Sequence, residues 1–211
     1  MDTLLFLEDY TDIFEYQLME STKENKDYFI RGVVSRAGTK NKNKRIYPRG
    51  VMESAIEELQ EAVSSGGFVG ELDHPPTPKI NVNKISHKIT KLKMAPDGAV
   101  LAEMVVLDTD EGRTLKKLID GGVRLGVSTR GLGGVRPYNG PLGEGLVEVQ
   151  PGFKMKAIDV VFDPSAGADG RPNFVTEGVT ENGVVLGYSR KLETVWNDVF
   201  GGNVWRNMKS Y

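Results

Sequence analysis

The chain has 211 residues, of which 39% are hydrophobic and 27% charged. This composition predicts one folded globular domain with a sizeable core, and it excludes a disordered or membrane-embedded chain. Lys and Arg number 27 and Asp and Glu number 29, so the formal net charge is −2 and no overall basic field attracts nucleic acid. Cys is absent and His occurs twice, which excludes a disulfide scaffold, a thiolate metal site, a Cys nucleophile and a multi-His metal centre.

The first residues carry no basic segment and soon become acidic, so they do not predict a secretory signal. No stretch approaches the roughly 18–20 apolar residues that a membrane-spanning helix needs. We therefore expect the protein to work in a cytoplasm-like compartment. After a short apolar start, residues 1–27 are acidic and polar, and they are predicted to be a loose arm or a propeptide-like extension.

The next part of the chain predicts a strand, a loop, a helix and a second strand. Residues 28–35 are rich in β-branched and aromatic residues, which is typical of a strand, and the basic residues 36–45 predict a loop. A helix is predicted over residues 50–64, because the apolar residues fall on one helical stripe and Pro48 precedes it. Residues 68–72 form a short predicted strand that ends at two prolines.

A hairpin and a second helix follow. Residues 85–94 and 99–107 are strand-like and are separated by the turn sequence APDG, which predicts a β-hairpin. A helix is predicted over residues 110–120, with apolar residues at helical spacing and a Gly directly after it.

Three further strands and a last helix complete the predicted elements. Residues 123–129 are strand-like and should be followed by a Gly-rich turn, and residues 146–150 and 155–162 predict two more strands. Apolar residues at helical spacing over 192–200 predict an amphipathic helix, which fits core packing and a docking or packaging signal equally well. The elements together predict an α+β protein: a small, mostly antiparallel β-barrel or a strongly twisted sheet with about three helices packed outside.

His74 is the first candidate for chemistry. It follows a predicted strand and precedes two prolines, which places it at the rim of the fold. An imidazole titrates near neutral pH and can act as a general base. A surface histidine in a turn remains the alternative, and His87, on a predicted strand, is interpreted as structural or exposed.

Ser128 is the second candidate, between a strand and several glycines. A serine nucleophile needs an exposed hydroxyl, a base and oxyanion donors, and the N–H groups near Arg130 and Gly131 could be those donors. The segment is not the G-x-S-x-G turn of hydrolases, because Arg130 occupies the place of the second Gly. A phosphate-binding loop or a plain turn remains open.

Asp159 is the third candidate, because a charged residue inside an apolar strand needs a partner. One role for it is to accept the imidazole N–H of a histidine and fix its tautomer. The alternatives are a solvated strand face for Asp159 and, as the runner-up acid, Asp163. The basic residues 41–48 are interpreted as a solvated loop rather than a nucleic-acid site.

These segments together resemble the prohead core proteases of tailed phages, in particular the T-even (myovirus) type. The matching stretches, in the family's order, are NKNKRIYP (41–48), GELDHPP (70–76), GVSTRGLG (126–133) and GFKMKAIDVVFDPSA (152–166). The resemblance covers about residues 28–176. It implies a serine endopeptidase with a fold similar to the herpesvirus assembly protease. We therefore expect a protease domain over residues 28–176, an N-terminal arm (1–27) that self-cleavage could remove, and a C-terminal segment (177–211) with the amphipathic helix.

The resemblance also implies roles for single residues. Ser128 matches the family's nucleophile, His74 its general base, and Asp159 best matches its strand Asp. Arg130 matches an Arg that supports the oxyanion segment together with Gly131. A peptidase of this kind needs no metal and no organic cofactor.

The implied substrates are the scaffold core and major capsid proteins and the chain itself, inside the prohead in the host cytoplasm. A homo-oligomer is possible, and neither nucleic acid nor membrane is an expected partner. The family's preference for cutting after an apolar-x-Glu sequence makes Leu18–Glu20 a candidate self-cleavage site, while Leu146–Glu148 fits the same pattern in a folded region. The alternatives are a non-catalytic capsid or tail structural protein, a hydrolase of small esters or amides, and a phosphate-binding protein.

Overall fold

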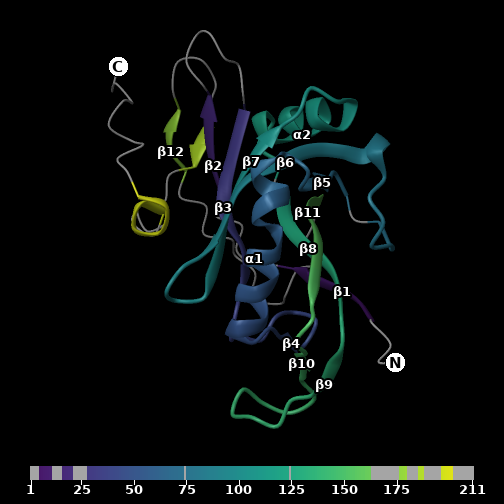
Figure 1. The fold of residues 1–211 in the computed structure, drawn as a ribbon. Helices are drawn as coiled ribbons and strands as arrows, with labels where there is room; N and C mark the ends of the chain where they lie inside the picture. Colours follow the sequence, from purple (N-terminus) through teal and green to yellow (C-terminus); the bar gives the residue numbers. More distant parts are fainter. Residues whose placement is uncertain are drawn as a thin grey trace.

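The computed structural model describes residues 5–10, 16–20, 28–73, 75–123, 125–162, 176–179, 185–187 and 196–201. Within these ranges the strands form four sheets, with helices packed beside them (Figure 1). The molecule is therefore a mixed α+β protein, as predicted. None of the helices in these ranges is long and apolar enough to cross a membrane.

The largest sheet is antiparallel and has the strand order β2-β3-β7-β6-β5. Its strands are β2 (Tyr16–Glu20), β3 (Tyr28–Arg36), β7 (Ala99–Val106), β6 (Ile85–Met94) and β5 (Val69–Glu71). β3 and β7 are buried along almost their whole length, as near-continuous apolar runs require. The predicted strand at residues 28–35, the strand at 68–72 and the hairpin are confirmed.

The second sheet places β8 (Leu125–Gly133) between β1 (Leu5–Tyr10) and β11 (Lys154–Phe162), both antiparallel to it. The predicted strand at 155–162 is confirmed, but the Gly-rich turn expected after Thr129 is wrong. The glycines continue the strand because it passes close to its neighbours: a Cβ on Gly131 would overlap the ring of Phe153.

The two sheets meet where β5 ends. Leu72 forms a parallel bridge with Val160 of β11, and the main-chain N–H of Asp73 donates to the carbonyl oxygen of Val160 at 2.8 Å. Within the described residues the sheets are not closed into a barrel, so the barrel that the sequence allowed is wrong. The contact between β5 and β11 instead brings the segment before His74 beside the strand that carries Asp159.

Two smaller sheets complete the described strands. β4 (Arg45–Ile46), β10 (Val147–Val149) and β9 (Val135–Pro137) form one, and β12 (Thr176–Val179) pairs with β13 (Val185–Gly187) in the other. β10 confirms the predicted strand at 146–150.

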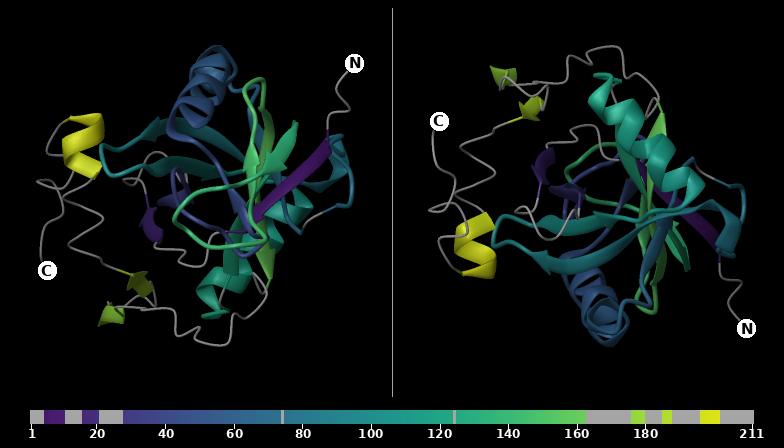
Figure 2. Two further views of the ribbon diagram at one scale, coloured as in Figure 1. Left: turned by 90° about the horizontal axis from the view of Figure 1, so that it is seen from below. Right: turned by 90° about the horizontal axis from the view of Figure 1, so that it is seen from above.

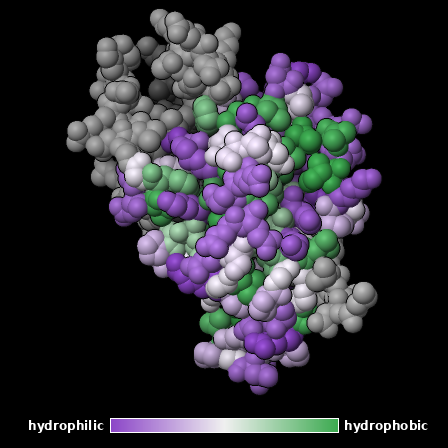
Figure 3. All heavy atoms as spheres, in the orientation of Figure 1, coloured by the Kyte–Doolittle hydropathy of each residue, from purple (hydrophilic) through white to green (hydrophobic). Residues whose placement is uncertain are grey.

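Helices α1 (Arg49–Ser64) and α2 (Asp110–Asp120) lie on opposite sides of the strands (Figure 2). Each buries the apolar stripe that predicted it, with Met52 and Leu115 at its centre, and the outward side chains of α1 are mostly exposed. In the view of Figure 3, hydrophilic side chains accordingly cover much of the surface at α1. A 3₁₀ turn, η1 (Val82–Lys84), precedes β6.

The helical segment at residues 196–200 packs on the end of the β6–β7 hairpin (Figure 2). Trp196 is buried in a cluster with Ala95, Ala99 and Leu101, and its ring stacks on Phe200 with the centroids 4.4 Å apart. Trp196 is therefore a core residue. The start of the predicted helix, residues 192–195, lies outside the described residues.

The structure describes two segments of the predicted N-terminal arm, and both are paired strands; the arm as a propeptide-like extension stays a prediction. β1 pairs with β8 and β2 pairs with β3, because the edges of β8 and β3 otherwise present unsatisfied backbone groups. Glu20 of the candidate cleavage site is the last residue of β2. The domain boundaries at residues 27 and 176 stay predictions.

Candidate active site

Ser128 lies in the middle of β8 with a strand on either side. Its register partners are Tyr10 of β1 and Asp159 of β11. Its side chain is fully buried, and its Oγ has no hydrogen-bond partner within the part of the chain that the structure describes. The exposed hydroxyl that the sequence suggested is therefore not what the structure shows. Because a buried hydroxyl without a partner costs about 1–3 kcal/mol, its presence in the core requires an explanation.

Ser128, Arg130 and Asp159 share one face of the β1-β8-β11 sheet. Residues directly opposite one another in an antiparallel pair point to the same side, and residues two apart along a strand do so as well. Thr129 and its partner Ile158 belong to the other face. The ladder between β8 and β11 thus brings together the predicted nucleophile, the predicted acid and the predicted Arg.

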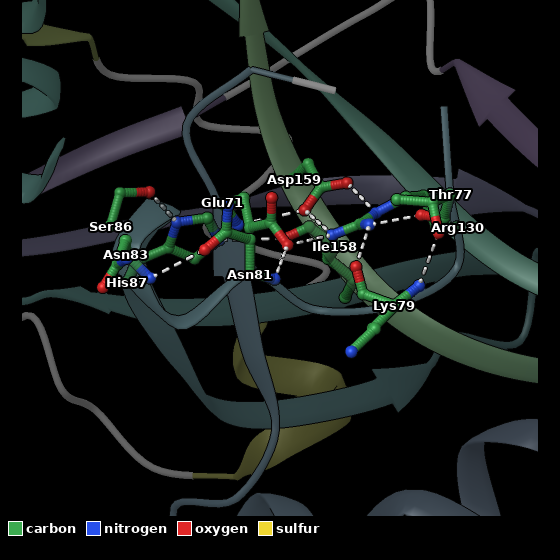
Figure 4. A network of polar contacts seen from close by, with 10 residues as sticks. All are labelled: Glu71, Thr77, Lys79, Asn81, Asn83, Ser86, His87, Arg130, Ile158 and Asp159. Atoms are coloured by element: carbon green, nitrogen blue, oxygen red, sulfur yellow. Dashed lines mark hydrogen bonds and ion pairs between the residues drawn. The ribbon is translucent and has the colours of Figure 1, made fainter. Parts of the chain in front are cut away.

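Arg130 forms a buried ion-pair network with Asp159 and Glu71 (Figure 4). Its Nε lies 2.5 Å from Oδ2 of Asp159, and its Nη2 donates to Oδ1 of Asp159 and to Oε1 of Glu71, each at 3.0 Å. Oδ1 of Asp159 also accepts the main-chain N–H of Glu71 at 2.9 Å. Asp159 thus has a charged partner, as the sequence required of it.

The same network holds the segment that follows His74. Nη1 of Arg130 donates to the carbonyl oxygen of Thr77 at 2.7 Å and lies 3.5 Å from that of Lys79. Oε1 of Glu71 accepts the main-chain N–H of Asn81 at 2.8 Å. Arg130 of β8 therefore holds Glu71, Thr77 and Lys79 directly, and Glu71 in turn holds Asn81.

The charges in the network are tightly coupled. Burial alone would lower the pKa of Arg130, but its hydrogen bonds and ion pairs with Asp159 and Glu71 outweigh burial and raise that pKa. The side chains of all three residues are at most 1% exposed, so each charge depends on the others for compensation. Removing one partner from such a buried group typically costs about 3–5 kcal/mol.

His87 is a buried structural residue that connects the two large sheets. Its Nε2 lies 2.9 Å from the carbonyl oxygen of Ile158, and its Nδ1 lies 2.8 Å from Oγ of Ser86. A carbonyl only accepts, so Nε2 carries the proton and Nδ1 accepts from Ser86. The ring fits because β5 has a glycine there: a Cβ on Gly70 would overlap both His87 and the Ile158 carbonyl. Burial lowers the pKa of His87, against the raising effects of Ile158 and Asp159.

Two predicted residues lie outside the described residues: His74, the proposed base, and Asp163, the runner-up acid. The residue before His74, Asp73, has a left-handed backbone with φ 72°. Its N–H is bonded to Val160, which is the neighbour of Asp159. Asp73, the residue directly before His74 in sequence, therefore lies beside β11, next to Asp159, which is opposite Ser128.

Arg130 and Gly131 are strand residues rather than parts of a loop. Each has register partners on both sides, in β1 and in β11, so its main-chain N–H lies within paired strands. The guanidinium of Arg130 is directed at Glu71, Asp159 and Thr77. The prediction that these two residues support an oxyanion stays a prediction.

Glu71 is the functional-site residue that the sequence analysis missed. It stands in the GELDHPP stretch, three positions before His74, yet it was given no role. The signal was available, because a carboxylate in a short strand beside apolar residues needs a partner just as Asp159 does. Its partner, Arg130, is 59 positions away in sequence.

Comparison with known proteins identifies the class. A family model described as "Prohead core protein serine protease" matches residues 10–182. The prohead core protein protease of Enterobacteria phage T4 is 34% identical over 158 residues, which cover 72% of this chain and 72% of that protein. The solved structure of the bacteriophage T4 capsid assembly protease matches with a TM-score of 0.68 and 26% identity, over 76% of this chain and 99% of that chain.

The fold and the site therefore define a peptidase of mixed α+β architecture. The chain belongs to the prohead core protein serine protease family. Its role is that of a prohead protease in capsid maturation. These matches confirm the predicted family, and they do not favour a non-catalytic capsid or tail protein. The likeness to the herpesvirus assembly protease stays a prediction.

Proposed function

We propose that the chain is a serine endopeptidase in which Ser128 is the nucleophile and His74 the general base. The observation that supports this most is the placement of Ser128. It lies in the middle of β8, directly opposite Asp159, with a buried hydroxyl that has no other partner among the described residues. A hydroxyl that is retained in the core without a hydrogen bond is expected where function requires it.

The proposed reaction follows from these roles. Oγ of Ser128 attacks a peptide carbonyl carbon and its proton passes to His74; main-chain N–H groups of β8 stabilise the resulting oxyanion. His74 then gives the proton to the departing amine, and an acyl-enzyme forms. Water, deprotonated by His74, hydrolyses the ester and restores Ser128.

Asp159 supports this site as a positioning residue. Its carboxylate binds Arg130 and the N–H of Glu71, and through them it holds Glu71 and Thr77, which stand on either side of His74 in the sequence. Holding the flanking residues restricts the positions that the proposed base can take, and such positioning favours the reaction. Asp163 is the alternative acid for direct contact with the imidazole.

The proposed substrates are proteins of the prohead interior: the scaffold core, the major capsid protein and the chain itself. The names of the two T4 proteins, a prohead core protein protease and a capsid assembly protease, support this. They likewise support a site of action inside the prohead in the host cytoplasm. Self-cleavage after Glu20 would release β1 and β2 together.

The test is cleavage of a purified prohead scaffold protein by four forms of the full chain. Wild type should cut it, whereas Ser128→Ala and His74→Ala should each lose at least about 1,000-fold in kcat, as removal of the attacking group or its base does. Ser35→Ala is the matched control, since Ser35 is also a fully buried strand serine but lies in the other sheet. Cleavage by Ser128→Ala at the wild-type rate would refute the assignment.

A further inference from the structure

We infer that the outer face of the large sheet, at the end of the β6–β7 hairpin, is a binding site for a short helix with two aromatic residues, and that residues 196–200 occupy it as a tethered, exchangeable ligand. We call this surface the aromatic socket. It combines apolar side chains with charged ones at its margin: Val33, Ala95, Ala99 and Leu101, with Arg31, Lys93 and Glu103. The socket lies away from the β1-β8-β11 sheet (Figure 2), so its test is independent of the role of Ser128.

The register of three strands builds the aromatic socket. Arg31 of β3 lies opposite Glu103 of β7, and Val33 lies opposite Leu101. On the other side of β7, β6 places Lys93 opposite Leu101. Residues directly opposite one another, and residues two apart along a strand, share one face of a sheet. A charged row and an apolar row therefore lie next to each other on the same side of the sheet.

The helical segment contacts this surface through two aromatic rings that are four positions apart. The Trp196 ring packs on the apolar row, with the guanidinium carbon of Arg31 5.0 Å from the ring centre. Nζ of Lys93 donates to the carbonyl oxygen of Val199 at 3.0 Å and lies 5.8 Å from the centre of the Phe200 ring. Each ring thus has a cation near its face, and an ammonium group meets the last turn of the helix, where a positive charge is favourable.

The small core around Trp196 is separate from the main hydrophobic core. Among the described residues the two cores have no member in common, because they lie on opposite faces of β3 and β7. A helix of about five residues is not stable by itself in water, so this segment is helical because it is docked. Its release would expose the aromatic socket and leave the main core packed, which makes it a local event rather than global unfolding.

The docked state leaves one polar group of Trp196 uncompensated. The indole Nε1 is buried and has no hydrogen-bond partner among the described residues. A buried N–H without an acceptor opposes docking, whereas the same N–H of a released segment can bind water. The segment is therefore held mainly by its two rings and can exchange with a competing helix.

These contacts define the ligand as a short helix with aromatic residues at positions i and i+4 and a carbonyl end that reaches Lys93. The face that receives it has three cations and one carboxylate, so its charge is positive: Arg31, Lys91, Lys93 and Glu103. Residues 196–200 include one acidic residue, Asp198, and no basic one, which complements this charge. The occupant that we assign is this segment of the chain.

The experiment opens the aromatic socket in the full chain and supplies the segment as a separate peptide. In the receptor variant, Trp196→Ala with Phe200→Ala, the tethered segment loses both rings and no longer fills the site. The probe is a fluorescein-labelled synthetic peptide of residues 192–204, and its binding is followed by fluorescence anisotropy. The control peptide has the same sequence with Trp196→Ala.

The receptor variant should bind the peptide at least tenfold more tightly than wild type, in which the tethered segment competes at high effective concentration. Lys93→Glu, added to the receptor variant, should weaken binding at least tenfold, whereas Lys40→Glu, an exposed lysine outside the socket, should leave it unchanged. The control peptide should bind at least tenfold more weakly than the probe. Equal affinity of the receptor variant and wild type, or binding to neither, would overturn the inference.

Two further measurements test whether the segment is separable. The receptor variant should still unfold cooperatively in urea, and failure to fold would overturn the inference because the main core must persist without the segment. In wild type, the indole N–H of Trp196 should exchange with solvent at least 100-fold faster than the main-chain N–H of Leu101, which lies in a central strand. Equal exchange rates would show that the segment leaves only on global unfolding and would likewise overturn the inference.

Discussion

Nη1 of Arg130 donates a hydrogen bond to the main-chain carbonyl oxygen of Thr77 at 2.7 Å, across 53 positions of sequence. Arg130 is two residues after Ser128 on the same strand, and Thr77 is three residues after His74. The contact therefore joins the strand of the proposed nucleophile to the segment of the proposed base. Because the acceptor is a main-chain atom, the link depends on Arg130 and not on the side chain of Thr77.

Arg130→Lys should impair activity although it keeps the charge. A lysine has one ammonium group, so it cannot contact Asp159, Glu71 and the Thr77 carbonyl together as the planar guanidinium does. We expect kcat to fall about 10- to 100-fold, as loss of a residue that orients a catalytic group does. The measurement is steady-state cleavage of scaffold protein.

Arg136→Lys is the control for this prediction, because Arg136 forms an exposed pair with Glu148. The free energy of unfolding of Arg136→Lys should stay within about 0.5 kcal/mol of the wild-type value. Wild-type kcat in Arg130→Lys would show that the guanidinium network does not position the site.

Gly70→Ala should destabilise the protein. The new Cβ would overlap the carbonyl oxygen of Ile158 and the ring of His87, so the contact between β5 and β11 must open. We expect a loss of about 2 kcal/mol or more in the free energy of unfolding, as for other forced overlaps in a core. Gly50→Ala is the matched control, since nothing lies within 4 Å of its Cβ position in α1. Urea unfolding of both variants tests the contrast.

His87 should make the protein less stable in mild acid. Burial lowers the pKa of His87 in the folded state, while in the unfolded chain it titrates near 6.5. The unfolded state therefore binds the proton first as the pH falls. Above about pH 6.5, neutral His87 makes its full contribution to the free energy of unfolding. Below that pH the free energy of unfolding falls by up to about 1.4 kcal/mol per pH unit, until the folded-state pKa is reached.

The check is the free energy of unfolding of wild type and His87→Gln between pH 8 and pH 5. A glutamine can donate a hydrogen bond to the carbonyl oxygen of Ile158 but does not titrate. The free energy of unfolding of the variant should therefore depend less steeply on pH than that of wild type. His74 is present in both proteins, so its own titration cancels in the difference. Identical slopes would show that His87 does not carry the effect.

Self-cleavage should occur after Glu20, the last residue of the candidate site Leu18–Glu20. Glu20 ends β2, and a cut there separates both N-terminal strands from the rest of the chain. We expect protein from mature heads to begin at Ser21, and Glu20→Gln to slow this processing at least tenfold. N-terminal sequencing is the measurement, and an intact Met1 in mature heads would exclude this site.

The helices and the hairpin could be predicted from the sequence because their signals are local. The stripe of α1 and the turn between β6 and β7 are determined by residues within one or two turns of each other. The same holds for the buried strand β11, whose Asp159 was expected to need a charged partner. The candidate residues themselves came from motifs and a family resemblance.

The partners of those residues were decided by the tertiary structure. Nothing local indicates that residues 5–10 pair with β8, or that Glu71 meets Arg130. Both depend on strand register, which is set by contacts between segments far apart in sequence. The chain thus determines by itself which elements form and which side chains can react. Only packing determines which buried charges compensate each other and which strand covers Ser128, because a buried charge or a strand edge is satisfied by whatever the fold brings to it.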